Sequence, residues 1–156
     1  LITFMKFVTD HMLGRLAKFL RFLGYDTIYP DFSYDDDSII NLAKSENRIL
    51  LSRDKEICSK YEKSFLIKSE DYIEQLKEVI KEFKLDNKNM LTRCSICNVP
   101  LINIEKERVM GKVPENVYNT HDEFYMCPSC GRIYWMGSHT KNIIERLEEV
   151  LNIENR

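Results

Sequence analysis

Four of the five cysteines fall in two pairs whose spacing is typical of a metal site. Cys94 and Cys97 form the first pair and Cys127 and Cys130 the second, with two residues inside each pair. A turn of this length aims two sulfurs at one ion, and two such turns complete a tetrahedral shell of thiolates. Gly131 follows the second pair, where the turn needs a residue that tolerates positive φ. We therefore predict a structural zinc site, with two disulfides or a chance arrangement as the alternatives.

Aspartates stand just beyond the apolar runs that the sequence predicts to be strands. Asp10 and Asp54 follow the first and third runs, Asp36 and Asp37 open the helix after the second, and Asp71 follows the fourth. A single aspartate in such a place is most often a helix cap. Several carboxylates gathered at one edge repel one another, and a divalent cation removes that repulsion. The cluster therefore predicts a Mg²⁺ or Mn²⁺ site that activates a water for attack on a phosphodiester.

The elements that must position these residues are strands alternating with helices. The apolar runs predict strands at 4–8, 26–29, 48–52 and 65–67, with a helical pattern after each. Such alternation implies right-handed crossovers and a parallel sheet that is covered by helices on both faces. Ligands bind beyond the carboxyl ends of the strands in open sheets of this kind. The aspartates are expected to converge at that edge.

The cysteine pairs belong to a second and smaller domain. Its strands are expected at 100–104, 117–120, 123–126 and 132–135, and Ser138 or Thr140 caps a final helix with one apolar side. A module of about 45 residues builds too small a core without a metal, which favours a zinc ribbon. The predicted domains are therefore 1–88, an α/β domain, and 89–156, a zinc ribbon with a C-terminal helix that docks on one of the domains.

Basic side chains near the aspartates are candidates for substrate binding. Arg15, Lys18 and Arg21 recur every three residues on the first helix, as either a solvated face or a ridge that binds phosphates. Arg53 stands beside Asp54, where it either contacts a phosphate or pairs with an acid.

Aromatic side chains of the second domain are also candidates. Tyr134, Trp135 and His139 could stack on the bases of a single strand. The alternative for Trp135 is that it packs the second domain against the first.

Composition sets the outer bounds. The chain has 156 residues, of which 44% are hydrophobic and 31% charged, so it can bury a core. Its net charge of −2 means that any contact with nucleic acid depends on local basic patches. No apolar run reaches the ~18 residues of a membrane span, and no signal peptide is recognisable. Cysteines in metal-like spacing favour a cytoplasmic protein.

Several of these stretches resemble one known family. The run from 10 to 26, DHMLGRLAKFLRFLGYD, looks like the opening of the mut-seven C-terminal RNase domain. The run RILLSRD at 48–54 is similar to its second signature, and the cysteine pairs with YWMGSH at 134–139 are similar to its zinc-ribbon part. The resemblance implies a PIN-like parallel sheet between helices, a zinc ribbon, and metal-dependent ribonuclease activity at the acidic edge. Asp10 and Asp54 match the family best, with either Asp36 or Asp37 as the third acid, and Ser52 stands where threonine is expected.

Three functions compete on this basis. The leading hypothesis is a ribonuclease that uses Mg²⁺ or Mn²⁺ to hydrolyse single-stranded or structured RNA. A non-catalytic RNA-binding or adaptor protein, which uses the zinc ribbon, is the alternative. A signalling receiver domain would explain Asp10 and Asp54, but it requires paired acids after the first strand and a lysine after a fifth, and neither is found here.

Overall fold

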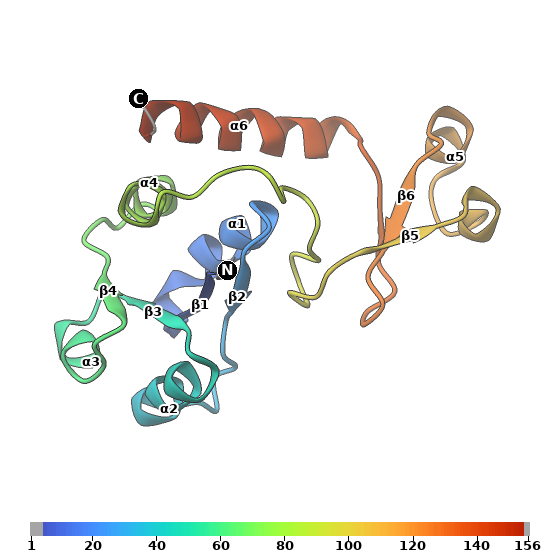
Figure 1. Cartoon of the computed structure of the whole chain (residues 1–156). Helices are drawn as coiled ribbons and strands as arrows, with labels where there is room; N and C mark the ends of the chain where they lie inside the picture. Colours follow the sequence, from blue (N-terminus) through green and yellow to red (C-terminus); the bar gives the residue numbers. More distant parts are fainter. Residues whose placement is uncertain (1–4, 155–156) are drawn as a thin grey trace.

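The computed structural model describes residues 5–154, and its centre is a four-stranded parallel sheet (Figure 1). The strands lie in the order β2-β1-β3-β4, and every neighbouring pair is parallel. Their bounds are Lys6–Thr9 for β1, Asp26–Ile28 for β2, Ile49–Ser52 for β3 and Ser64–Leu66 for β4. The predicted parallel sheet of four strands is confirmed.

Helices cover both faces of this sheet, which explains why the central strands β1 and β3 bury apolar residues on both sides. Phe7 and Leu51 face a core built with α1 and α4, whereas Val8 and Leu50 face a core built with α2 and α3. The helices are η1 (His11–Leu13), α1 (Gly14–Phe22), α2 (Asp36–Glu46), α3 (Lys55–Ser59) and α4 (Tyr72–Phe83). The predicted covering of the sheet by helices is confirmed.

The C-terminal part, residues 89–154, contains an antiparallel sheet in the order β5-β6-β7. Its core is small and consists of Ile104, Val109 and Phe124 with half-buried neighbours. The elements before the last helix are β5 (Ile102–Ile104), η2 (Lys106–Val109), α5 (Glu115–Thr120), β6 (Phe124–Met126) and β7 (Ile133–Tyr134).

The predicted strand at 117–120 is wrong, because these residues lie in α5. Pro114 stands at the N-cap of this helix and Glu115 in its first turn, both of which favour a helix start. Val117 and Tyr118, which suggested a strand, pack as neighbours on the small core from the helix instead.

The last helix, α6 (Ser138–Glu154), returns to the N-terminal part and packs across α4 (Figure 1). Leu147, Val150 and Leu151 join the core on the α1 and α4 face of the parallel sheet. Arg146 also donates a hydrogen bond to the Tyr72 hydroxyl at 2.7 Å. Among the described residues, no helix combines the length and apolar character needed to cross a membrane.

The segment between the two sheets is fixed to the end of α1 and to β2. The Arg21 guanidinium donates to the backbone oxygens of Ser95 and Ile96 at 3.0 and 3.1 Å, and to that of Thr27 at 2.9 Å. Arg21 therefore does not extend the basic ridge of Arg15 and Lys18. It holds the first cysteine turn against the N-terminal part instead.

Gly24 ends the first helix, as the sequence predicts, with a φ of +95°. A Cβ atom there would lie 2.0 Å from the backbone oxygen of Asn89. The close approach of the connecting segment to the end of α1 therefore requires glycine at this position.

A buried arginine links the parallel sheet to its edge strand. Arg48 is 5% exposed, and its guanidinium donates to the Asp26 carboxylate at 2.8 Å, to the Phe7 backbone oxygen at 3.0 Å and to Glu46 at 2.9 Å. Burial alone would raise the pKa of Asp26, but hydrogen bonds from Arg48 and Asn98 outweigh it and lower that pKa.

Asp26→Asn should therefore destabilise the protein near neutral pH. Because the pKa of Asp26 is lower in the folded state, its contribution is present above the unfolded pKa of about 4 and is lost as the pH falls through the folded value. We expect a loss of about 1–2 kcal/mol in the free energy of unfolding at pH 7, and this difference should shrink below about pH 4. Urea denaturation of both proteins between pH 3 and 7 measures it, and a difference that does not change with pH would contradict this account.

Candidate functional site

The four cysteines of the two pairs meet at one point of the structure. Their sulfur atoms all lie within 4.8 Å of one another, and each cysteine is free rather than in a disulfide. Four sulfur ligands that come from two separate turns suit a tetrahedral structural metal. The predicted metal-ligating set of Cys94, Cys97, Cys127 and Cys130 is therefore brought together.

The two cysteine turns have the same backbone geometry. In the first, the Asn98 N–H donates to the Cys94 oxygen at 2.9 Å, and the Cys97 N–H donates to the Cys94 sulfur at 3.4 Å. The second turn repeats both bonds, from Gly131 and Cys130 to Cys127, at the same lengths. Asn98 and Gly131 both have positive φ, at 66° and 76°, as the sequence predicts for Gly131.

Tyr134 supports this site with its hydroxyl, which lies 3.1 Å from the Cys94 sulfur. Burial alone would raise the pKa of the Cys94 thiol, but hydrogen bonds from Tyr134 and from backbone N–H groups lower it to about 6. Burial and this contact raise the pKa of Tyr134 to about 12, so its hydroxyl remains a donor. Cys94 is therefore prepared to be the thiolate that a metal binds.

Asn98 does more than close its turn. Its side-chain oxygen accepts from the buried Thr27 N–H at 2.9 Å, and its amide donates to Asp26 at 2.7 Å. Gly131 is exposed, and a Cβ added there would meet nothing within 4 Å. One cysteine turn is therefore attached to the edge of the parallel sheet, and the other faces solvent.

Asn98→Gly should keep the metal and weaken this attachment. Glycine tolerates the positive φ, whereas the loss of two hydrogen bonds should lower the free energy of unfolding by roughly 1–3 kcal/mol. The matched control is Gly131→Asn, which we expect to lower stability by no more than about 1 kcal/mol, because the site is exposed and asparagine already adopts the equivalent positive φ at position 98. Metal analysis and urea denaturation test this, and loss of the metal from Asn98→Gly would contradict the separate roles of turn and side chain.

A second site lies at the carboxyl edge of the parallel sheet. A cavity of about 720 Å³ is lined there by Asp10 and Asp54, which follow β1 and β3, and by Asp36, which opens α2. The other lining residues are His11, Met12, Arg53, Lys55 and Ile57. We call this the acidic cavity. Of the five aspartates that the sequence singles out, the structure thus brings three together.

The fourth predicted aspartate, Asp37, does not line the acidic cavity. It follows Asp36 in the first turn of α2, where successive side chains point in different directions. Asp71 lines a neighbouring cavity together with Arg15 and Tyr72. Of the alternatives that the sequence left open, Asp36 is therefore the one placed beside Asp10 and Asp54.

The Ser52 hydroxyl connects two of these aspartates. It donates to Oδ2 of Asp10 at 2.5 Å and accepts from the Asp54 N–H at 3.0 Å. Oδ1 of Asp10 accepts from the Met12 N–H at 2.9 Å, so both of its oxygens are held. Ser52 is fully buried, and the sequence analysis identified it only as part of a signature, without a role.

Asp10 and Asp54 are also helix caps, which was the alternative interpretation. Asp10 caps η1 and Asp54 caps α3, and both capping bonds of Asp54 go to its Oδ1. In α2 the cap is Asp35, which accepts from the Ser38 N–H at 2.8 Å. Asp36 is therefore not needed as a cap of α2. Capping of α3 uses only Oδ1 of Asp54 and leaves its Oδ2 free of capping bonds.

The spacing of the three carboxylates limits how they could bind an ion. Across residues 5–154, the cysteine cluster is the only group of three or more histidine, cysteine or acidic ligand atoms that lie within 4.8 Å of one another. Asp10, Asp36 and Asp54 thus share a cavity but do not form a closed ligand shell.

An exposed rim beside the acidic cavity was not found from the sequence. Phe32 is 82% exposed and its ring lies 5.1 Å from that of His11, while Met12 is 77% exposed. His11 Nε2 lies 2.8 Å from the backbone oxygen of Asp31. The sequence feature that could have indicated this rim is Phe32, a single phenylalanine in the polar loop after Pro30.

The predicted substrate-binding residues divide among three neighbouring cavities. Arg53 lines the acidic cavity, with its guanidinium 3.7 Å from the exposed carboxylate of Glu70. Arg15 stacks on the Tyr72 ring at 3.9 Å beside the cavity that contains Asp71. The other three line a cavity between α1 and the C-terminal part, and they are Lys18, Trp135 and His139.

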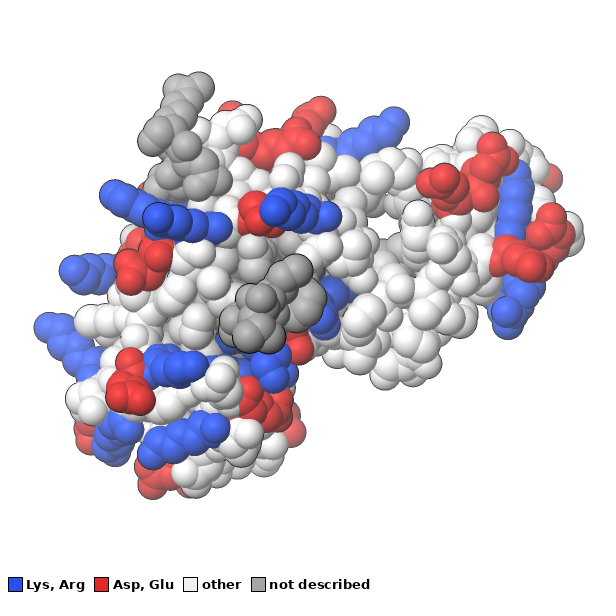
Figure 2. Space-filling view, viewed as in Figure 1, with Lys and Arg blue, Asp and Glu red and all other residues white. Residues whose placement is uncertain are grey.

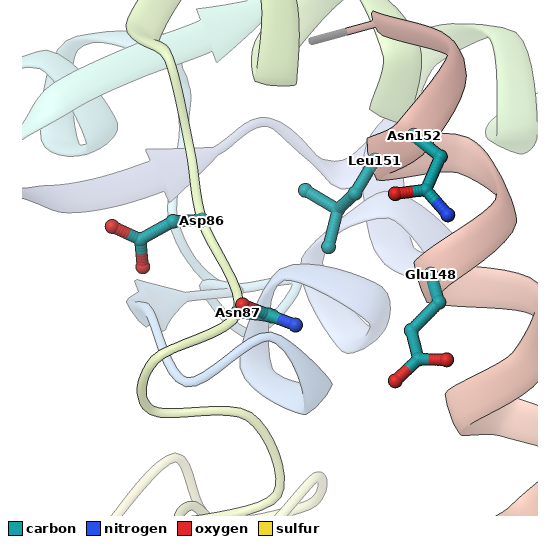
Figure 3. A pocket seen from close by; sticks show the side chains of 5 residues that line it. All are labelled: Asp86, Asn87, Glu148, Leu151 and Asn152. Atoms are coloured by element: carbon teal, nitrogen blue, oxygen red, sulfur yellow. The ribbon is translucent and has the colours of Figure 1, made fainter.

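A further cavity, between the connecting segment and α6, gathers none of the predicted residues. It is lined by Asp86, Asn87, Glu148, Leu151 and Asn152. Figure 3 shows the Asp86 carboxylate turned away from α6, so the two acids do not converge.

The fold and these sites define an α/β protein with an acidic sheet edge and a cluster of four cysteines able to hold a metal. The family model of the Mut7-C RNAse domain matches residues 5–147, and the chain belongs to this family. No curated protein and no solved structure gives a significant match to the chain.

Proposed function

We propose that this protein is a metal-dependent ribonuclease that hydrolyses RNA phosphodiester bonds in the acidic cavity. The observation that carries the proposal is the meeting of Asp10, Asp36 and Asp54 in one cavity at the carboxyl edge of the sheet. The name of the family, an RNAse domain, supports RNA as the substrate. A PIN-like arrangement of the parallel sheet belongs to the same proposal, as does a cytoplasmic location.

The ligands of the acidic cavity fit Mg²⁺ or Mn²⁺. Carboxylate oxygens are the hard donors that these ions prefer, and no cysteine or histidine other than His11 lines the cavity among the described residues. The spacing of the three acids suits an ion that retains part of its water shell, as Mg²⁺ does. Such an ion would neutralise charge on the phosphodiester and provide an activated water.

The side chains of the cavity have separate roles in this proposal. Asp10 is held rigidly by Ser52 and the Met12 N–H, so it presents fixed negative charge. Oδ2 of Asp54 is left over from capping and is available to bind the ion or to accept a proton from the attacking water. Arg53 and Lys55 line the same cavity and supply positive charge for the substrate phosphate.

The cysteine centre is proposed to hold zinc in a ribbon that supports the RNA. Zn²⁺ favours four thiolates in tetrahedral geometry, and the small core of Ile104, Val109 and Phe124 needs a metal for stability.

A non-catalytic RNA-binding protein is the second candidate. The capping bonds of Asp10 and Asp54 favour it, because they give both carboxylates a structural reason to be present. This candidate predicts RNA binding without turnover, undiminished when Mg²⁺ is chelated.

Cleavage of labelled RNA by aspartate variants tests the proposal. Asparagine also caps helices well, so Asp10→Asn and Asp54→Asn should fold while RNA cleavage falls about 100-fold or more. Asp36→Asn should lose activity to a similar extent. The matched control Asp37→Asn, one residue away and outside the cavity, should stay within about threefold of wild type. EDTA should abolish cleavage, and Mn²⁺ or Mg²⁺ should restore it.

Two results would contradict the proposed ribonuclease activity. Wild-type cleavage rates in Asp54→Asn, with the cysteine-bound metal verified in each preparation, would refute the mechanism. RNA that is bound but never cut, with or without Mn²⁺, would favour the RNA-binding candidate.

Ser52 should act as a positioning residue for the two carboxylates. Ser52→Ala removes the donor to Asp10 and the acceptor for the Asp54 N–H, and such outer partners typically contribute 10–100-fold. We expect a loss of about that size in cleavage, together with a higher Mn²⁺ concentration for half-maximal activity. Ser52→Thr keeps the hydroxyl and should restore both, whereas equal rates in Ser52→Ala and wild type would contradict this role.

A further inference from the structure

A cavity of about 280 Å³ lies between α1 and the C-terminal part, beside the start of α6. We call it the interdomain cavity. Its N-terminal wall includes Lys18 and Phe22 of α1, and its opposite wall includes Tyr125 and Trp135. Figure 2 shows an opening between the two parts beneath α6, with uncharged surface beside it. The walls come from segments about 100 residues apart in sequence.

The lining of the interdomain cavity combines flat apolar rings with positive charge. Its aromatic residues are Phe22, Tyr125, Tyr134 and Trp135, its basic residues and histidine are Lys18, Arg93, Arg132 and His139, and its one acid is Glu123. Aromatic faces bind bases of any sequence by stacking, and basic groups bind the phosphates beside them. This chemistry suits a nucleotide. An acyl chain would not use the basic groups, and an acidic peptide would not need the aromatic rings.

One face of the first helical segment runs from the acidic cavity to the interdomain cavity. Met12 lines the acidic cavity, Arg15 shares the neighbouring cavity with Met12, and Lys18 and Phe22 line the interdomain cavity. Met12 lies in η1, directly before α1, and the spacing of three or four residues places Arg15, Lys18 and Phe22 on the same side of α1. Arg15 and Lys18 are three residues apart on α1, which separates them by about 5 Å along its axis. Arg15, held over the Tyr72 ring, lies between the two ends.

We propose that the interdomain cavity binds a nucleobase of the same RNA strand that enters the acidic cavity, with Arg15 and Lys18 on the phosphates between. The base must be unpaired, because a base in a duplex has to leave its stack to reach such a pocket. The substrate is therefore an RNA with a single-stranded segment of several nucleotides. This inference rests on the proposed function for the role of the acidic cavity, but the binding of the base can be measured without cleavage.

Trp135 is the only tryptophan of the chain and lines the interdomain cavity, so its fluorescence reports directly on occupancy. The experiment uses the full-length Asp54→Asn protein in EDTA, with its cysteine-bound metal verified. The probes are an eight-nucleotide adenosine oligoribonucleotide, labelled for anisotropy, and a twelve-base-pair RNA duplex. We expect the single strand to quench Trp135 saturably, and the duplex to bind at least about tenfold more weakly with no quenching.

Substitutions in the same background separate the walls of the cavity. Tyr125 is 37% exposed, and Tyr125→Ala should weaken binding of the single strand about 10-fold, within the range for loss of one stacked base. Lys18→Ala should weaken it about threefold to tenfold. The matched control is Lys44→Ala, an exposed lysine in the last turn of α2 and outside the three cavities, which should bind like the parent protein.

The outcomes distinguish this inference from the proposed function. Single-stranded RNA that binds by anisotropy without changing Trp135 fluorescence would overturn the inference, as would equal quenching by the duplex or unchanged affinity in both Tyr125→Ala and Lys18→Ala. Quenching by the single strand in a protein whose wild type cuts no RNA would support the cavity and refute the nuclease. Cleavage by the wild type without any Trp135 response would support the nuclease and overturn the proposed base binding in the interdomain cavity.

Discussion

The hydrogen bonds of one buried hydroxyl hold the candidate active site together. The neighbouring parallel strands β1 and β3 bring their carboxyl ends to one edge, where the Asp10 N–H donates to the Leu51 oxygen at 3.2 Å, but this backbone pairing does not by itself connect Asp10 to Asp54. The Ser52 hydroxyl joins them, because it donates to the Asp10 carboxylate and accepts from the Asp54 backbone. The cost of placing acids close together is offset by these bonds and by helix N-termini, which favour negative charge. The acidic cavity is thus a product of the sheet rather than of a flexible loop.

The C-terminal part depends on the same sheet through its edge strand. Arg21 and Asn98 attach the first cysteine turn to α1 and β2, while α6 returns across α4 and contributes to the main core. The first cysteine turn and α6 therefore fix the C-terminal part to the N-terminal part at two places (Figure 1). This double attachment sets the walls of the interdomain cavity. It explains how the small antiparallel sheet can form a binding surface together with the N-terminal part.

The sequence predicted most of the features that depend on short-range sequence pattern. The four strands followed from apolar runs buried on both faces, and the cysteine turns followed from spacing, with Gly131 at positive φ. The strand expected at 117–120 failed because Pro114 and Glu115 favour a helix start more strongly than Val117 and Tyr118 favour a strand. Contacts between segments far apart in sequence decide which of Asp36 and Asp37 faces the acidic cavity. Such contacts also remove Arg21 from the basic ridge. Those contacts had no signal in the sequence.

We propose that Asp10 and Asp54 together bind a divalent cation in a cavity separate from the cysteine cluster. Manganese binding tests it most directly, measured by electron paramagnetic resonance on protein loaded with zinc at the cysteines. The account predicts one saturable Mn²⁺ site in the wild type that is lost in the Asp10→Asn/Asp54→Asn double variant, while the zinc content stays the same. Equal Mn²⁺ binding by both proteins would contradict it, because the cation would then lie elsewhere.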